Sequence, residues 1–272
     1  MGARMKLGSF RCLGAAACFL AICVFPVATS AGAPPRVVHV FVALADNQHQ
    51  GIVPVPSFLG NGEDPAHNLY WGAVFGVKTY FKNSAEWELL RCNHATKMEV
   101  LERCIFRNRG GADVYLIADA YDGSQIKKCV TDFLAAAAGA VPENIWVPTK
   151  SLEISIAAGG AADLLVYVGH DAFMDFQIPS IVGKKEGKPR RTIILACASR
   201  PYFASYLRAT GAEPLLWTTG LMAPEAYTLQ AALTGWIAGE SDQAIRDRAA
   251  AAYDKYQKCG ARAALRLFAT GW

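Results

Sequence analysis

Two short apolar runs, each followed closely by a side chain that can do chemistry, constrain the fold of this chain most strongly. The runs are Leu164–Val168 and Ile193–Ala196; His170 follows the first and Cys197 follows the second. Continuous apolar runs that end at polar residues are typical of strands in a parallel α/β sheet, which is buried on both faces. Ligands bind such sheets at the carboxyl ends of the strands. If the two strands are neighbours, His170 and Cys197 meet at one sheet edge, as a thiolate–imidazole pair requires.

The remaining sequence alternates between expected strands and expected helices. Further strands are expected at Val37–Ala45, Val114–Ala118 and Pro214–Thr219. Capping residues predict helices from Asp64 to about Lys82, from Asp122 to Ala138, from Pro201 to about Ala209, from Pro224 to Ala238, from Ser241 to about Gln257 and over Ala261–Phe268. This alternation predicts one α/β domain, residues 36–272, with a mainly parallel sheet.

The sequence leaves the structure of two segments open. Trp87–Arg91 and Val100–Phe106 fit a hairpin, although the second segment fits a helix equally well. Val141–Ile156 shows no decisive pattern.

The first 30 residues have the composition of an export signal. Arg4, Lys6 and Arg11 form a basic start, and an apolar stretch broken by a proline follows over Cys12–Ala28. Small residues at 28–30 suit a signal peptidase. Because a membrane anchor needs about 20 uninterrupted apolar residues, we expect a protein that is periplasmic or secreted and has no membrane span once the leader is removed.

Removal of this leader changes the charge balance. The whole chain has 27 basic and 23 acidic residues, and the leader carries three of the basic residues and no acidic ones. The remaining 24 basic residues nearly balance the 23 acidic residues. A nearly neutral domain gives no indication of nucleic-acid binding.

The cysteine count beyond the leader is odd. The five residues are Cys92, Cys104, Cys129, Cys197 and Cys259. In an exported protein, an odd count suggests a free thiol beside disulfides. The simplest partition pairs Cys92 with Cys104 and Cys129 with Cys259, and it leaves Cys197 free; the alternative is that all five are reduced and buried.

Two interpretations of the free thiol compete. A lone cysteine is more often a buried structural residue than a nucleophile. The position of His170 on the preceding strand favours catalysis, because an imidazole or a helix N-terminus, here a helix beginning near Pro201, can generate the thiolate. A metal site formed by His170, Asp171 and Asp175 matches no zinc spacing. The sequence contains no nucleophile elbow, P-loop or dinucleotide fingerprint, so neither a metal nor an organic cofactor is expected.

A strand ending in Gly-His, a loop, and then a strand ending in Ala-Cys resemble the caspase-like cysteine peptidases of clan CD. Val166–His170 and Ile193–Cys197 are similar to the gingipain and CHAT versions of these blocks. The strand and helix expected after Cys197 also match the family order. The resemblance covers roughly residues 36–260, with only the two blocks specific, and it implies a three-layer α/β sandwich.

The resemblance further implies an exported, endopeptidase-like hydrolase that cleaves peptide bonds. Cys197 would attack the scissile carbonyl, and His170 would polarise that carbonyl or assist proton transfer. The backbone amides of Asp171 and Cys197 would form the oxyanion hole. The family usually has glycine directly after the histidine, whereas this chain has Asp171, which keeps the amide but has less backbone freedom.

The substrate implied by the resemblance is a peptide or a protein. The candidate substrate-binding residues, on the strand after the nucleophile and at the end of the first strand, are Trp217, Thr218, Thr219, Asp46 and Asn47. The sequence assigns no side-chain preference. One alternative is a catalytically inactive caspase-like binding or structural module, which Asp171 favours. Another is a thiol hydrolase that acts on a non-peptide amide or ester.

Overall fold

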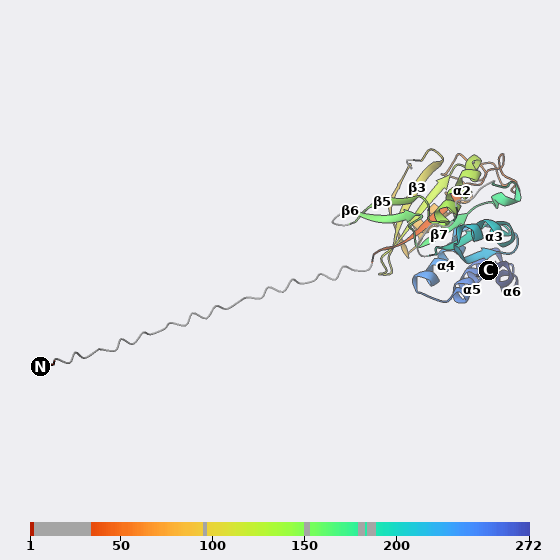
Figure 1. Ribbon diagram of the computed structural model, residues 1–272. Coiled ribbons are helices and arrows are strands. Elements are labelled where there is room, and N and C mark those ends of the chain that lie inside the picture. Colours follow the sequence, from red (N-terminus) through yellow and green to blue (C-terminus); the bar gives the residue numbers. More distant parts are fainter. Residues whose placement is uncertain (3–33, 95–96, 150–152, 179–182, 184–188) are drawn as a thin grey trace. The chain divides into compact units, whose positions relative to one another are not determined.

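An eight-stranded sheet forms the centre of the computed structural model (Figure 1). The structure describes residues 1–2, 34–94, 97–149, 153–178, 183 and 189–272, so the expected leader at residues 1–30 lies almost wholly outside the described residues. The chain divides into two units, Met1–Ala33 and Pro34–Trp272, and all of the described helices and strands belong to the second.

The strands of this sheet are mainly parallel. They are β1 Arg36–Ala43, β2 Trp87–Asn93, β3 Val100–Asn108, β4 Val114–Tyr121, β7 Leu164–Val168, β8 Arg191–Leu195, β9 Glu213–Thr218 and β10 Phe268–Ala269. Their order across the sheet is β10-β9-β8-β7-β1-β4-β3-β2. The five strands from β9 to β4 run parallel. At the edges each strand pairs antiparallel with its neighbour: β10 with β9, β3 with β4, and β2 with β3. The predicted α/β fold is therefore confirmed, and Val100–Phe106 is a strand of the β2–β3 hairpin rather than a helix.

Helices cover both faces of the sheet, which makes the three-layer sandwich. They are α1 Val77–Asn83, α2 Ile126–Ala137, α3 Ser199–Thr210, α4 Ala226–Ile237, α5 Asp242–Gln257 and α6 Ala261–Leu267. Alternate residues of β1 belong to two separate cores: Val38 and Val40 pack in the core with α1, α4 and α5, whereas Val37 and Phe41 pack in the core with α2 and α3. Because both sets are apolar, the strand appears in the sequence as an apolar run that only His39 interrupts.

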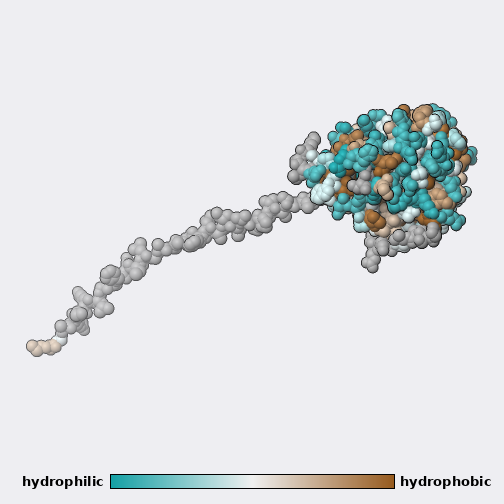
Figure 2. All heavy atoms as spheres, turned by 90° about the horizontal axis from the view of Figure 1, so that it is seen from above, coloured by the Kyte–Doolittle hydropathy of each residue, from teal (hydrophilic) through white to brown (hydrophobic). Residues whose placement is uncertain are grey.

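The outer face seen in Figure 2 is mostly hydrophilic, with separate hydrophobic spots. The chain is 53% hydrophobic, and the two cores beneath the helices bury a large share of those side chains. This is the arrangement expected when apolar residues of both sheet faces are covered by helices.

The segment that the sequence left open, Val141–Ile156, forms most of a separate two-stranded sheet. Its strands are β5 Pro142–Pro148 and β6 Glu153–Gly159. The backbone N–H of Gly159 donates to Nδ1 of His39 at 3.0 Å, and Nε2 of His39 lies 3.1 Å from Asp119. His39 is therefore a buried structural residue that joins this hairpin to the central sheet.

A buried charge cluster strengthens the same junction. Arg103 donates to both carboxylate oxygens of Asp119, at 2.5 and 2.6 Å, and to Glu143 at 2.6 Å. Despite full burial, these donors and His39 hold the pKa of the Asp119 carboxyl below its usual range. Breaking one partner of such a cluster leaves an uncompensated buried charge, which costs several kcal/mol.

The helix expected from Asp64 to about Lys82 is much shorter in the structure, where α1 begins only at Val77. Asp64 does accept a hydrogen bond from Ala66, as a cap would. However, the side chain of Asn68 exchanges hydrogen bonds with both backbone groups of Ala45 at the end of β1. These contacts stabilise a series of turns, so a local start signal was overridden by a contact distant in sequence.

Candidate active site

The strands that carry His170 and Cys197 are neighbours. β7 and β8 pair in parallel with Val168 opposite Leu195, and the N–H of Gly169 donates to Leu195 at 3.2 Å. His170 and Cys197 each lie two positions beyond the carboxyl end of their strand. His170 and Cys197 line one cavity of about 480 Å³, so the structure brings together the pair that the sequence singled out.

Cys197 is a half-buried free thiol beside the segment that follows β9. Its Sγ accepts a hydrogen bond from the N–H of Met222 at 3.4 Å and lies 3.5 Å from the carbonyl oxygen of the same residue. Burial raises the pKa of Cys197, the Met222 amide lowers it, and the nearby charge of Asp171 raises it again. The raised pKa favours the protonated thiol over the thiolate, so a base that accepts the proton would assist nucleophilic attack by Cys197.

The first amides of α3 do not serve the sulfur. Ala198 has left-handed backbone dihedrals, with φ of 46°, and its N–H donates to Gly220 at 2.7 Å. The N–H of Ser199 donates to the Thr218 hydroxyl at 3.0 Å. The expectation that the helix aims its amides at Cys197 is therefore wrong at these two positions, because the turn directs them to β9 and its following loop.

His170 is held by contacts on both its backbone and its ring. Its side chain is 6% exposed, and Nε2 lies 2.8 Å from Oδ2 of Asp175. The same carboxylate accepts a hydrogen bond from the N–H of Gly51 at 2.9 Å. The hydroxyl of Tyr167 donates to the carbonyl oxygen of His170 at 2.8 Å. The sequence suggested Asp175 only as a rejected metal ligand and missed this role.

Asp171 fits its position without needing the freedom of glycine. Its φ is −76°, and its Oδ1 accepts a hydrogen bond from the N–H of Phe173 at 3.0 Å at the start of the short helix Ala172–Met174. Its other oxygen is buried without a hydrogen-bond partner among the described residues. Burial raises the pKa of the Asp171 carboxyl to about 7. The residue therefore changes charge near neutral pH, next to the candidate dyad.

The walls of the dyad cavity are mainly apolar. The apolar lining comprises Ile52, Val53, Leu69, Tyr70, Met174, Leu221, Met222, Ala223 and Pro224. Glu225 and Gln257 also line it, and Oε2 of Glu225 accepts hydrogen bonds from Tyr227 at 2.7 Å and Gln257 at 3.0 Å. The sequence analysis pointed to β9 and missed the segment after it, Leu221–Glu225, which lines the cavity.

The expected substrate-binding edge is not open. Trp217 and Thr218 are buried and pair with Ala269 and Phe268 of β10, and the N–H of Thr219 donates to Leu267 at 2.8 Å. A strand from the end of the chain thus occupies the edge that a peptide would need. Peptide pairing along this edge therefore conflicts with the position of β10, and substrate binding by the three residues stays a prediction.

Asp46 and Asn47 also lie away from the dyad. They line a separate cavity of about 490 Å³. Asp46 accepts hydrogen bonds from the backbone of Gln48 and His49, and Asn47 exchanges hydrogen bonds with Val55. These two residues stabilise the loop after β1, and the expectation that they bind substrate stays a prediction.

The cysteines follow the simplest partition only in part. Cys92 and Cys104 lie opposite one another on β2 and β3 and form a disulfide. Cys129 is buried within α2, whereas Cys259 is exposed, and both are free thiols. The expected Cys129–Cys259 disulfide is therefore wrong, because Cys129 faces the core. Among the described residues, Glu102 and the sulfurs of Cys92 and Cys104 lie close enough together to hold a metal ion. These two sulfurs are bonded to each other, so they are not thiolate ligands.

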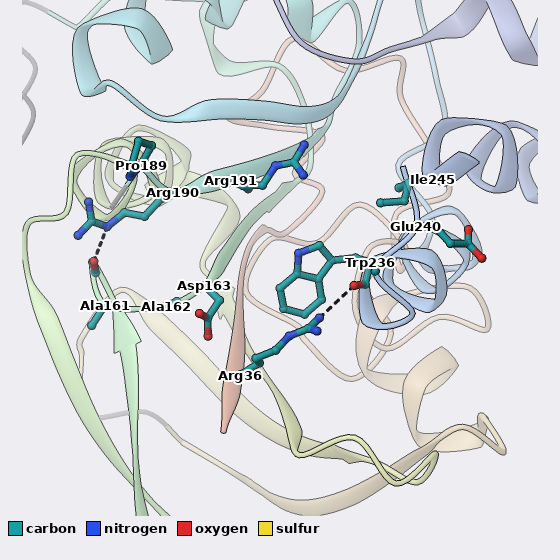
Figure 3. A pocket seen from close by; sticks show the side chains of 12 residues that line it. Arg36, Ala161, Ala162, Asp163, Pro189, Arg190, Arg191, Trp236, Glu240 and Ile245 are labelled. Carbon is teal, nitrogen blue, oxygen red and sulfur yellow. Dashed lines mark hydrogen bonds between the residues drawn. The ribbon is translucent and has the colours of Figure 1, made fainter. Parts of the chain in front are cut away.

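A third cavity, of about 510 Å³, lies at the opposite ends of the strands (Figure 3). Arg36 begins β1 there, stacks on the Trp236 ring at 3.8 Å and donates to the carbonyl oxygen of Trp236 at 3.0 Å. Arg191, at the start of β8, forms an ion pair with Asp242 at 2.5 Å. These two arginines connect α4 and α5 to the sheet, so we assign them a structural role.

Comparisons with protein-family models, curated proteins and solved structures found no match. Among the described residues, no helix has the length and apolar character needed to cross a membrane. The caspase-like resemblance thus stays a prediction that rests on the two sequence blocks.

Proposed function

We propose that the protein is a cysteine hydrolase that cleaves peptide bonds, with Cys197 as nucleophile and His170 as proton acceptor. One observation carries the proposal: a free thiol and an imidazole follow adjacent parallel strands and line the same cavity. Because burial raises the pKa of Cys197, the thiol needs a base at the moment of attack.

The proposed reaction is ordinary acyl transfer. The sulfur bonds to the carbonyl carbon while the thiol proton passes to His170. The proton then goes to the leaving amine as the C–N bond breaks, and water releases the acyl group from sulfur. The amides of Asp171 and Cys197 are the proposed oxyanion donors. Protonated Asp171 is compatible with that oxyanion, whereas its charged form, above a pKa of about 7, opposes it.

The residues that line the cavity indicate which substrate side chain it would prefer. Its apolar walls suit the stem of a long side chain, and the Glu225 carboxylate favours a cationic end over an anionic one. We also propose that the protein is exported, on the composition of residues 1–30 and the Cys92–Cys104 disulfide.

Iodoacetamide alkylation tests the dyad, and the chain supplies its own reference thiol. Cys259 is exposed and free, so an unassisted Cys197, with its raised pKa, would label more slowly than Cys259. We expect mass spectrometry to show faster labelling of Cys197 at neutral pH, and His170→Ala to remove the advantage. His67→Ala, at an exposed histidine on another loop, is the control. Slower labelling of Cys197 that His170→Ala leaves unchanged would contradict the dyad.

The alternative function is a catalytically inactive caspase-like binding module. The observation that favours it is the buried carboxyl of Asp171 beside the thiol. Profiling with a peptide library separates the two functions: the peptidase cleaves members of the library, and the module binds without cleavage. Turnover of simple esters or amides without peptide cleavage would point to a non-peptide hydrolase.

A further inference from the structure

We infer that Asp175 is a positioning residue for His170 and extends the proposed dyad to a Cys197–His170–Asp175 relay held in place by Gly51. This inference rests on the proposed function of the cavity. It goes beyond the dyad because it assigns a third side chain and a contact from a distant loop.

The geometry around Asp175 is that of an orienting carboxylate. Its Oδ2 lies 2.8 Å from Nε2 of His170 and 2.9 Å from the N–H of Gly51. The histidine side chain is 6% exposed and lines the cavity, whereas that of Asp175 is 31% exposed and does not belong to the cavity lining. The carboxylate can only accept, which places the proton of a neutral imidazole on Nε2. Nδ1 is then the nitrogen with a lone pair to receive the thiol proton.

Gly51 contributes its lack of a side chain as well as its amide. A Cβ atom at position 51 would clash sterically with Oδ1 of Asp175. The loop after β1 therefore approaches the carboxylate as closely as a bare backbone allows. Together, the ring of His170 on one side and the loop on the other hold the carboxylate in one orientation.

The charge of Asp175 stabilises the imidazolium that forms when Cys197 transfers its proton. Among the described residues, the other titratable groups that line the cavity are Cys197, Tyr70 and Glu225, and the charge of Asp171 raises the pKa of Cys197 from outside the lining. Of these groups, Asp171 also responds to Asp175, whose charge raises the pKa of the Asp171 carboxyl, so the comparison is repeated in an Asp171→Asn background, where that carboxyl no longer titrates. A difference in thiol reactivity therefore reports on the Asp175 carboxylate.

Alkylation of Cys197 over a range of pH tests the inference in the full-length protein. We expect Asp175→Asn to slow labelling about tenfold at neutral pH, the effect of about one pKa unit in proton affinity. In alkaline solution, above the raised pKa of Cys197, the thiolate forms without a base and the two rates should converge. Asp175→Glu should restore part of the neutral-pH rate. A merely structural role would slow labelling equally at every pH.

Two further variants separate the possible outcomes. Gly51→Ala displaces the carboxylate without removing a charge and should reproduce the neutral-pH loss. Asp64→Asn breaks an exposed aspartate–histidine pair of 2.7 Å on another loop and should leave the rate unchanged. If His170→Ala slows labelling but Asp175→Asn does not, the relay is wrong and the dyad stands. If His170→Ala has no effect, the proposed function itself fails.

Discussion

Replacing Asp171 by asparagine should change how the stability of the protein depends on pH. Asp171 is fully buried, and its pKa is raised from 3.8 to about 7 by burial. Asparagine keeps the oxygen that accepts the hydrogen bond from Phe173 and imitates the protonated carboxyl. The variant therefore removes one ionisation while retaining the helix cap.

The sign of the effect follows from proton binding. Because the folded protein holds this proton more tightly than the unfolded chain does, the free energy of unfolding of the wild type falls as pH rises from about 4 to about 7, and this contribution is constant above that range. Each pKa unit corresponds to about 1.4 kcal/mol. The stability of Asp171→Asn relative to wild type should thus increase by about 3 kcal/mol between about pH 4.5 and about pH 8.5.

Urea unfolding at several pH values measures this difference. Asp247→Asn, at an exposed aspartate on α5, is the control and should give a curve parallel to wild type. A constant difference between Asp171→Asn and wild type over the whole range would refute the raised pKa. The variant should also alkylate faster at Cys197 above about pH 7, since the charge of Asp171 raises the pKa of that thiol.

Two other substitutions test the fold and the cavity. Arg103→Met should lower the free energy of unfolding by about 3–5 kcal/mol, because it leaves the Asp119 carboxylate buried without its main partner; urea titration at neutral pH measures the loss. That loss should shrink as pH falls below about 4, where the stabilisation linked to the lowered pKa of Asp119 disappears. Glu225→Gln should reduce any preference for lysine or arginine over norleucine about tenfold in a fluorogenic peptide series, and an unchanged ratio would remove Glu225 from substrate recognition.

Most of the sheet could be predicted from the sequence because its signals are local. Strands such as Leu164–Val168 are buried on both faces and therefore appear as continuous apolar runs. The ends of those runs locate His170 and Cys197 at equivalent positions. Helices with a cap and a clear end, such as the one beginning after Ser241, lie within a few residues of their predicted limits.

Local signals failed where a contact distant in sequence decided the structure. Asn68 holds the segment after Asp64 in turns by bonding to the end of β1. The burial of Cys129 prevents its pairing with Cys259, although parity allowed it. No capping residue or periodicity reports such contacts, because each depends on where another segment packs.

The chain by itself therefore determined the strands around the site and the two residues most able to do chemistry. The tertiary structure alone decided what surrounds them. It placed Gly51 against Asp175, 124 residues away, brought Glu225 to the cavity wall, and closed the β9 edge with Phe268 and Ala269 of β10. The physical reason is that secondary structure and burial depend mainly on residues close together in the sequence. Hydrogen-bond partners and cavity walls form only when separate segments pack together.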